Sequence, residues 1–159
     1  MRNYAIYKSN APNSLLDWAK YANPLKVLRN VIIIESAKYL PLQLKNKLYR
    51  AIGIKIGKNV AIAYKVTMDI LFPELIEIGD NTIIGYGCTL LAHEFLTKEM
   101  RVGKIAIGSN VMVGANSTIL AGVTIGDNAT ISAMSLVNKD VQNNAFVGGV
   151  PVNKLKRPK

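Results

Sequence analysis

The sequence predicts a mainly β protein, a parallel β-helix of about four turns with an N-terminal helical segment. From Ile107 to Gln142 an aliphatic residue recurs at every sixth position, and the fifth position of each unit is small or β-branched. A short fixed period is typical of architectures in which each unit buries its apolar side only by stacking on its neighbours. The unit heads in this stretch are Ile107, Val113, Ile119, Ile125, Ile131 and Val137.

A longer period divides these units into turns. The six-residue rule also holds at Ile56, Ile62, Met68, Ile78, Ile84 and Leu90, which brings the total to twelve units. The residue after the head is small in most units but not in the third unit of each turn, where Asp69, Leu91, Leu120 and Asn138 stand. A period of three units predicts a coil with three flat sides and four turns.

Residues 1–55 are predicted to form a helical cap. A first helix begins at Leu15 with Ser14 or Asn13 as its N-cap, a second runs over residues 25–40, and a third runs over residues 42–52. The second helix has an apolar face beside basic residues. It either covers the open end of the coil or lies on an anionic membrane surface. The first alternative is favoured because the ends of solenoids need capping.

The coil itself is predicted over residues 56–142, and residues 143–159 form a C-terminal turn and a basic tail. Loops are inserted at residues 73–77 and 96–106. Both loops follow the third unit of a turn, so both leave the coil at the same corner. In repeat proteins, insertions that collect on one edge tend to build the binding face.

The net charge of +10 is concentrated at the two ends of the chain. Residues 1–55 carry +8 and residues 143–159 carry +4, whereas residues 56–142 carry −2. Basic residues do not alternate with aromatic ones along any stretch, so nucleic acid is not an expected partner. The single cysteine, Cys88, cannot form an internal disulfide, and no signal-peptide or membrane-spanning stretch is evident. We therefore expect a cytoplasmic protein, with peripheral membrane contact through residues 25–40 left open.

Four stretches between Ile56 and Lys156 carry a resemblance to a known family: IGKNVA, IGDNTIIGYGCTLLAHEF, IGSNVMVGANSTILAGVTIGDNATISAMSLVNKDV and VGGVPVNKLK. They resemble the left-handed parallel β-helix acyltransferases with hexapeptide repeats, which include the galactoside, maltose and xenobiotic O-acetyltransferases. The left hand of the coil is implied by the resemblance alone, because parallel crossovers are generally right-handed. The resemblance also implies acetyl-CoA as a cosubstrate and a homotrimer with its sites at subunit interfaces.

His93 is the candidate general base. It is the only histidine, its ordinary pKa suits proton uptake near neutral pH, and it stands where the resembled family keeps its catalytic base. Asp69 would lie one turn below and close to it, as an acid that orients the imidazole, as a contact for the acceptor hydroxyl, or as an ordinary solvated corner residue. Glu94 is the alternative orienting acid, although neighbouring residues of a strand usually point to opposite faces. One histidine cannot form the three-histidine zinc site of the γ-class carbonic anhydrases, so no metal is expected.

The cofactor residues are carried over from the resemblance, position by position. Ala115 stands where the family often has a serine, Ala133 stands at a small cofactor-contacting position, and Asn138 and Lys139 stand where the family usually reads Thr-Lys. After the turn at Gly148 to Pro151, Asn153 and Lys156 occupy two positions where a galactoside-type enzyme has arginines. Lys154 and Lys156 supply positive charge as point donors to phosphate.

These observations predict an acetyl-CoA-dependent O-acetyltransferase that acts on a hydroxyl of a sugar, a glycan or a related small molecule. His93 would deprotonate the acceptor, which would attack the thioester directly. One rival is a catalytically silent hexapeptide trimer that serves as a scaffold or membrane-surface adaptor. An N-acetyltransferase acting on an amino sugar is the nearer alternative, since an amine acceptor needs no different scaffold.

Overall fold

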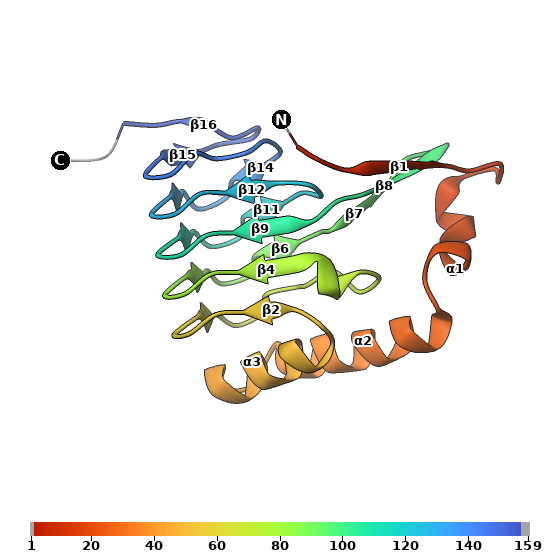
Figure 1. The fold of residues 1–159 in the computed structure, drawn as a ribbon, viewed down its shortest axis with the longest axis horizontal. Coiled ribbons are helices and arrows are strands. Elements are labelled where there is room, and N and C mark those ends of the chain that lie inside the picture. Colours follow the sequence, from red (N-terminus) through yellow and green to blue (C-terminus); the bar gives the residue numbers. More distant parts are fainter. Residues whose placement is uncertain (1, 157–159) are drawn as a thin grey trace.

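The computed structural model describes residues 2–156 and shows a three-sided parallel coil with helices at one end (Figure 1). The first side stacks β2 (Lys55–Ile56), β4 (Ile76–Ile78), β9 (Ile105–Ile107) and β12 (Thr124–Ile125). The second stacks β3 (Ala61–Ile62), β5 (Ile83–Ile84), β10 (Met112–Val113), β13 (Thr130–Ile131) and β15 (Phe146–Gly148). The third stacks β6 (Thr89–Leu90), β11 (Thr118–Ile119) and β14 (Leu136–Val137).

The aliphatic heads of the six-residue units line the interior of the coil. Ile62, Ile84 and Ile131 are all completely buried, and they occupy one register of the second side. Most corners between the sides are made by asparagines in the left-handed backbone region, with φ of 55–59° at Asn59, Asn81, Asn110, Asn116, Asn128 and Asn144, and Lys65 and Met134 take the same conformation. Asparagine tolerates this conformation better than other residues that carry a Cβ atom. The repeated asparagine of the sequence therefore marks the corners.

The coil extends beyond the predicted end at Gln142. Val141 bridges to Ile125 on the first side, and β15 pairs in parallel with β13 on the second side. The chain then reverses at Gly149 to Pro151, and β16 (Asn153–Lys154) returns antiparallel to β15. The segment predicted as a C-terminal turn therefore belongs to the last coil, because β15 extends the second side and β16 pairs with it.

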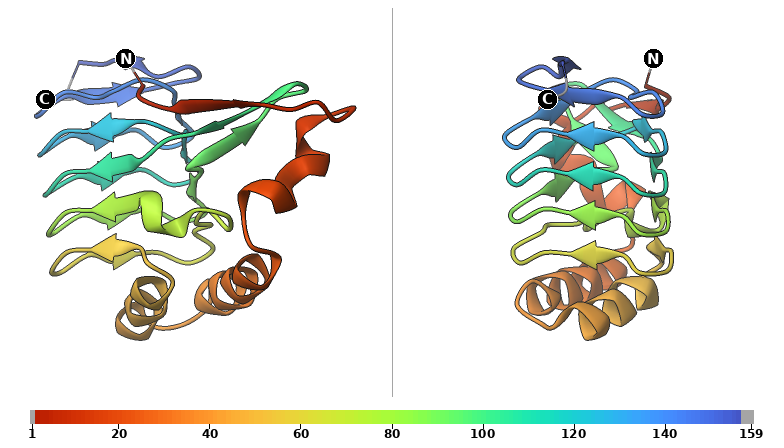
Figure 2. Two further views of the ribbon diagram at one scale, coloured as in Figure 1. Left: turned by 45° about the vertical axis from the view of Figure 1, so that its right-hand side comes forward. Right: turned by 90° about the vertical axis from the view of Figure 1, so that its left-hand side faces the viewer.

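Two helices lie under the first coil and cover that end of the core (Figures 1 and 2). The Asn23 side chain caps α2 (Pro24–Ala37) by accepting from the Leu25 amide at 2.9 Å. Ile34 of α2 and Tyr49 of α3 (Leu42–Ala51) are completely buried in the same apolar cluster as the coil interior. Burial raises the pKa of the Tyr49 hydroxyl. None of the helices within residues 2–156 has the length and apolar character needed to cross a membrane.

The first residues form a strand, which the helical prediction for residues 1–55 did not include. Strand β1 (Ala5–Lys8) pairs antiparallel with β8 (Glu99–Val102), and β8 pairs antiparallel with β7 (His93–Phe95). The inserted loop 96–106 is therefore mostly a hairpin that projects from the coil, with β1 along its outer edge (Figure 2). Without β1, the outer edge of β8 would present unpaired backbone N–H and C=O groups. Strand β1 forms hydrogen bonds with this edge.

A short arm connects β1 to α2. It contains the 3₁₀ helix η1 (Ser14–Asp17) and the single-turn α-helix α1 (Trp18–Tyr21). The chain thus becomes helical near the predicted start at Leu15, but Ser14 lies inside η1 and the Asn13 side chain makes no cap. Asp17 holds the arm in place, since its carboxylate accepts from the Ser9 hydroxyl and pairs with Lys20 at 2.7 Å. The shorter insertion forms the turn η2 (Pro73–Leu75). Cys88 is completely buried, as its inward repeat position predicts, and burial raises its pKa.

Candidate functional site

His93 lies where the chain leaves the third side of the coil. Leu91 hydrogen-bonds to the third side through Ile119, and two residues later His93 opens strand β7 of the projecting hairpin. Its side chain is 13% exposed. The imidazole is therefore held at the junction between a rigid coil and the hairpin, with limited access for water.

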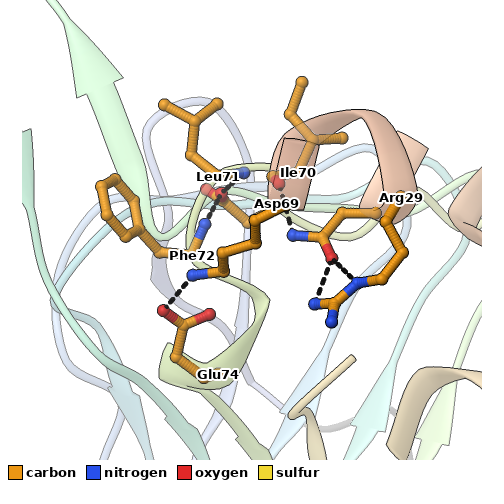
Figure 3. Close-up of polar contacts among 8 residues, drawn as sticks. Arg29, Asp69, Ile70, Leu71, Phe72 and Glu74 are labelled. Carbon is orange, nitrogen blue, oxygen red and sulfur yellow. Dashed lines mark hydrogen bonds and ion pairs between the residues drawn. The ribbon is translucent and has the colours of Figure 1, made fainter. Parts of the chain in front are cut away.

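The Asp69 carboxylate faces the imidazole of His93. Oδ2 of Asp69 lies 2.6 Å from Nδ1 of His93 and also accepts the His93 backbone N–H at 3.0 Å. Oδ1 accepts the backbone N–H groups of Leu71 and Phe72, each at 2.8 Å (Figure 3). Asp69 is completely buried, so the alternative of a solvated corner residue is wrong.

This arrangement selects one tautomer of a neutral histidine. An ionised carboxylate can only accept hydrogen bonds, so the Nδ1 atom that faces it must carry the proton. The other ring nitrogen, Nε2, then has a free lone pair and can take a proton from a bound hydroxyl. Because three backbone N–H groups fix the carboxylate, the orientation of the imidazole is fixed as well.

Glu94 lies in a different environment from the imidazole. Its carboxylate binds the Arg2 guanidinium at 2.6 Å, and its cross-strand partner is Arg101. The guanidinium groups of Arg2 and Arg101 both lie over the ring of Tyr4, at 5.1 and 5.3 Å from its centroid. Glu94 thus belongs to a polar cluster that ties the N-terminus to the hairpin, and the geometry favours Asp69 as the orienting acid.

Two aromatic rings flank His93 and were not among the predicted site residues. The Phe72 ring lies edge-on at 6.1 Å from the imidazole, and the Phe95 ring lies edge-on at 5.2 Å, both measured between centroids. Phe72 comes from the turn that Asp69 caps, and Phe95 follows His93 by two residues on the same strand face. The only sequence signal for them was their position beside the two insertions.

The corner between the second and third sides becomes less bulky toward the C-terminal coils. The equivalent position is occupied in successive coils by Tyr64, Tyr86, Ala115, Ala133 and Gly149, as the ladder of backbone hydrogen bonds shows. Tyr64 and Tyr86 are exposed large side chains, whereas Ala115 and Ala133 carry only a methyl group. Neighbouring coils pack so closely at this corner that a Cβ atom added to Gly114 would lie 2.4 Å from the backbone nitrogen of Ala133. At this corner, the small side chains of the upper coils leave more room for an extended ligand than the tyrosines of the lower coils.

The remaining predicted cofactor residues gather near the C-terminal end of the coil. Lys139 Nζ donates to the Asn153 side-chain oxygen at 3.2 Å, which brings the last full turn and β16 together. Lys139 and Lys154 both line a cavity of about 450 Å³ at this end, and Lys156 is exposed nearby in the chain. The buried Oδ1 of Asn138 has no hydrogen-bond partner among residues 2–156.

Asn138 is stacked in line with Leu91, which precedes His93 by two residues. Backbone hydrogen bonds run from Leu91 to Ile119 and from Leu120 to Val137, so Leu91, Leu120 and Asn138 form one column on the third side. Two strand spacings span about 10 Å. Asn138 thus lies on the same side of the coil as the segment that leads to His93. In the described part of the chain, no three His, Cys, Asp or Glu side chains gather as a metal site requires.

Comparison with known proteins identifies similar sequences and folds. The family "Bacterial transferase hexapeptide (six repeats)" matches residues 104–139. The putative acetyltransferase YvoF of Bacillus subtilis (strain 168) is 50% identical over 156 residues, covering 96% of this chain and 90% of the relative. The galactoside O-acetyltransferase of Escherichia coli (strain K12) is 38% identical over 111 residues, covering 65% of this chain and 54% of that protein.

A solved structure agrees with the fold over almost the whole chain. The hexapeptide-repeat-containing acetyltransferase VCA0836 of Vibrio cholerae O1 biovar eltor, complexed with acetyl coenzyme A, superposes with a TM-score of 0.72. It covers 92% of this chain and 98% of its own, at 24% identity. This likeness confirms the mainly β hexapeptide-repeat coil, which in such proteins is left-handed.

Proposed function

This chain belongs to the hexapeptide-repeat acetyltransferase family, and on that basis we propose that it is an acetyl-CoA-dependent O-acetyltransferase acting on a hydroxyl of a sugar, glycan or related small molecule. The pairing of Asp69 with His93 at 2.6 Å carries the proposal, because it gives the chain an oriented base. A catalytically silent scaffold would have no use for a buried carboxylate aimed at the only histidine. The family relationship and this pairing both favour an enzyme over the scaffold alternative.

His93 acts on the acceptor in this proposal. Its Nε2 atom takes the hydroxyl proton while the acceptor oxygen forms a bond to the acetyl carbonyl carbon. When the carbon–sulfur bond breaks, the imidazolium returns the proton to the leaving thiolate. Asp69 keeps Nδ1 protonated throughout and stabilises the imidazolium that forms. A covalent acyl-enzyme is not part of the mechanism, since Cys88 is completely buried and its pKa is raised by burial.

The upper coils are proposed to hold the cosubstrate. Ala115 and Ala133 leave space along the corner, and the unused oxygen of Asn138 offers an acceptor for an amide N–H. Lys139, Lys154 and Lys156 supply positive charge for phosphate groups, with Asn153 linked to Lys139. That VCA0836 was solved with acetyl coenzyme A supports acetyl-CoA as the ligand of this coil.

Calorimetric titration with acetyl-CoA in the absence of an acceptor tests this proposal. Saturable binding at one site per chain is the expected result. The absence of heat up to millimolar acetyl-CoA, from protein whose fold is verified by circular dichroism, would contradict it. The O-acetyl product is distinguished from an N-acetyl product by offering matched sugars that differ only in a hydroxyl or an amine. Transfer to the amine alone would favour the amino-sugar alternative.

A homotrimer is proposed as the assembled form. A groove of about 560 Å³ runs along the outer surface of β2, β4, β9 and β12, a flat sheet face that no other element of residues 2–156 covers. It contains none of the candidate catalytic or cofactor residues, so another copy could cover it without covering those residues on the same chain. Light scattering on the purified protein is expected to yield three times the chain mass of 17.4 kDa. A monomer at micromolar concentration would contradict the proposal.

The end helices cap the coil, which is the favoured alternative, and the outward face of α2 is proposed to lie on an anionic membrane surface as well. Leu25, Leu28 and Ile32 form an outward stripe on α2 with exposed fractions of 77%, 58% and 58%, and Lys47 is exposed on the neighbouring α3. An apolar stripe beside basic residues suits the headgroup region. Vesicles containing phosphatidylglycerol are expected to co-sediment the protein, and Leu28→Glu with Ile32→Glu to abolish this. Ile83→Glu, at an exposed site on the coil, is the matched control. Failure of the wild type to bind any vesicle would contradict the contact.

A further inference from the structure

One face of the projecting sheet carries His93 together with side chains from the N-terminal strand. In antiparallel pairs, residues directly opposite one another point to the same face. His93 is opposite Val102, and Phe95 is opposite Met100, which in turn is opposite Tyr7. Tyr7 therefore lies on the His93 side of the sheet, whereas Glu94 and Arg101 lie on the other side.

A cavity of about 250 Å³ opens on this same face. It is lined by Tyr7, Lys20, Tyr21, Phe72, Met100 and Val102. Two of these walls adjoin His93 directly, since Val102 is its cross-strand partner and the Phe72 ring is 6.1 Å from the imidazole. Of the other walls, Met100 belongs to β8, whereas Tyr7, Lys20 and Tyr21 come from β1 and the N-terminal arm. The cavity is thus bounded by segments far apart in the sequence and lies beside the candidate base.

The walls are aromatic and apolar, with polar groups at the rim. The rings of Tyr7 and Tyr21 are 5.8 Å apart and tilted by 56°. Met100 is almost completely buried, while the Lys20 side chain is 72% exposed and held by Asp17. A pyranose ring has one face of C–H groups, which stacks on aromatic rings, and an edge of hydroxyls, which suits phenol and ammonium groups.

We propose that this cavity is the acceptor subsite, and that it binds a pyranoside whose apolar ring face stacks against Tyr7 and Tyr21 while a hydroxyl points to His93. The proposal rests on the proposed function, because it assumes that His93 deprotonates the acceptor. It assigns a role in acceptor binding to the segment of residues 5–21, which packs along the projecting hairpin. Tyr7 and Tyr21 then determine which acceptors are used without taking part in proton transfer.

Acceptor kinetics test the two tyrosines. With methyl and p-nitrophenyl β-D-pyranosides as acceptors, Tyr7→Ala and Tyr21→Ala are each expected to raise the acceptor KM about tenfold. The dissociation constant of acetyl-CoA, measured by calorimetry, is expected to stay the same. Tyr7→Phe and Tyr21→Phe keep the ring and should retain most of the affinity. Tyr39→Ala is the matched control, since Tyr39 is an exposed tyrosine at the far end of α2.

Methyl NMR of protein labelled at the methionine methyl groups gives a second readout that does not depend on any variant folding. Adding a methyl pyranoside is expected to shift the Met100 methyl signal, because Met100 lines the cavity. Met68 in the coil core, and Met112 and Met134 on its exterior, serve as internal controls that should not move.

The outcomes separate the subsite from the proposed function. If the wild type acetylates pyranosides but the alanine variants keep the acceptor KM and Met100 does not shift, the subsite is wrong and the function stands. A Met100 shift without turnover supports the subsite while contradicting the function. Transfer only to acceptors without a sugar ring overturns the pyranoside assignment.

Discussion

Nδ1 of His93 lies 2.6 Å from Oδ2 of Asp69, although 24 residues separate the two in the chain. Stacking of successive coils causes this proximity, because Thr67 bridges to Thr89 and so places residue 69 under the end of β6. The same carboxylate accepts three backbone N–H groups. The coil therefore provides the rigid support that a base needs to keep one orientation.

Replacing His93 by alanine is expected to abolish turnover without unfolding the protein. The loss of the base should lower kcat by about 10²- to 10⁴-fold. The acetyl-CoA dissociation constant and the thermal midpoint serve as controls, and both should stay close to wild type. Retention of more than a few per cent of the rate would remove His93 from the role of general base.

Asp69→Asn is expected to lower kcat by about 10³-fold or more, because it changes which imidazole nitrogen of His93 carries the proton. If the amide oxygen keeps its bonds to Leu71 and Phe72, the NH₂ group faces Nδ1, and Nε2 must then carry the proton. Kinetics measured together with ¹⁵N NMR of the imidazole would show both effects. Glu94→Gln is the matched control and should keep the wild-type tautomer. An unchanged tautomer in Asp69→Asn would contradict the argument.

Lys139→Glu is expected to raise the KM for acetyl-CoA more than that for the acceptor. The substitution places negative charge beside Asn153 and Lys154, where the cosubstrate phosphates are proposed to bind. Steady-state kinetics with each substrate varied in turn provide the measurement. Lys58→Glu, at an exposed position on the first coil, controls for net charge. A larger effect on the acceptor KM would mean that this end of the coil does not hold the cosubstrate.

The stability provided by Asp17 is expected to depend on pH. Hydrogen bonds from Lys20, and then from Ser9, hold the pKa of Asp17 below its ordinary value of 3.8. A lowered pKa in the folded state means that the stabilisation is complete above the unfolded value and disappears as pH falls through the folded value. Urea unfolding should show Asp17→Asn less stable than wild type at pH 7 and equally stable at the lowest pH at which both fold. Equal stability at both pH values would show that Asp17 does not anchor the arm.

Gly114→Ala is expected to destabilise the upper coils by about 1–3 kcal/mol. The added Cβ would lie 2.4 Å from the Ala133 nitrogen, so two adjacent coils would have to move apart. Ala63→Ser, at the equivalent position of the first coil, should change the free energy of unfolding by less than about 0.5 kcal/mol. Denaturant titration gives both values. If Gly114→Ala left the free energy of unfolding unchanged, the two coils would be able to move apart without destabilising the protein.

The sequence predicted much of the site, because the site residues lie on a coil whose sequence repeats every six residues. The phase of the repeat placed Asp69 one turn from the His93 segment, and the structure brings them into contact. The sequence left open the choice between Asp69 and Glu94, since it depends on which faces of β7 His93 and Glu94 take once the hairpin has formed. Glu94 takes the face with Arg2, which lies 92 residues away in the chain. No pattern among neighbouring residues of the sequence indicates that Glu94 pairs with Arg2.

Sequence alone was sufficient for the coil, its inward-facing residues, the position of its insertions and the single candidate base. The coil, its inward-facing residues and its insertions follow from hydrophobic periodicity, which acts between neighbouring units and is visible within a few residues. The candidate base follows from the presence of a single histidine and from the family resemblance. Only the tertiary structure showed β1 on the edge of β8, the contact of the Asp69 carboxylate with Nδ1 of His93 and the aromatic cavity beside the imidazole. Each of these depends on contacts between distant segments, whose energies are set by burial and edge-strand pairing and leave no period in the chain.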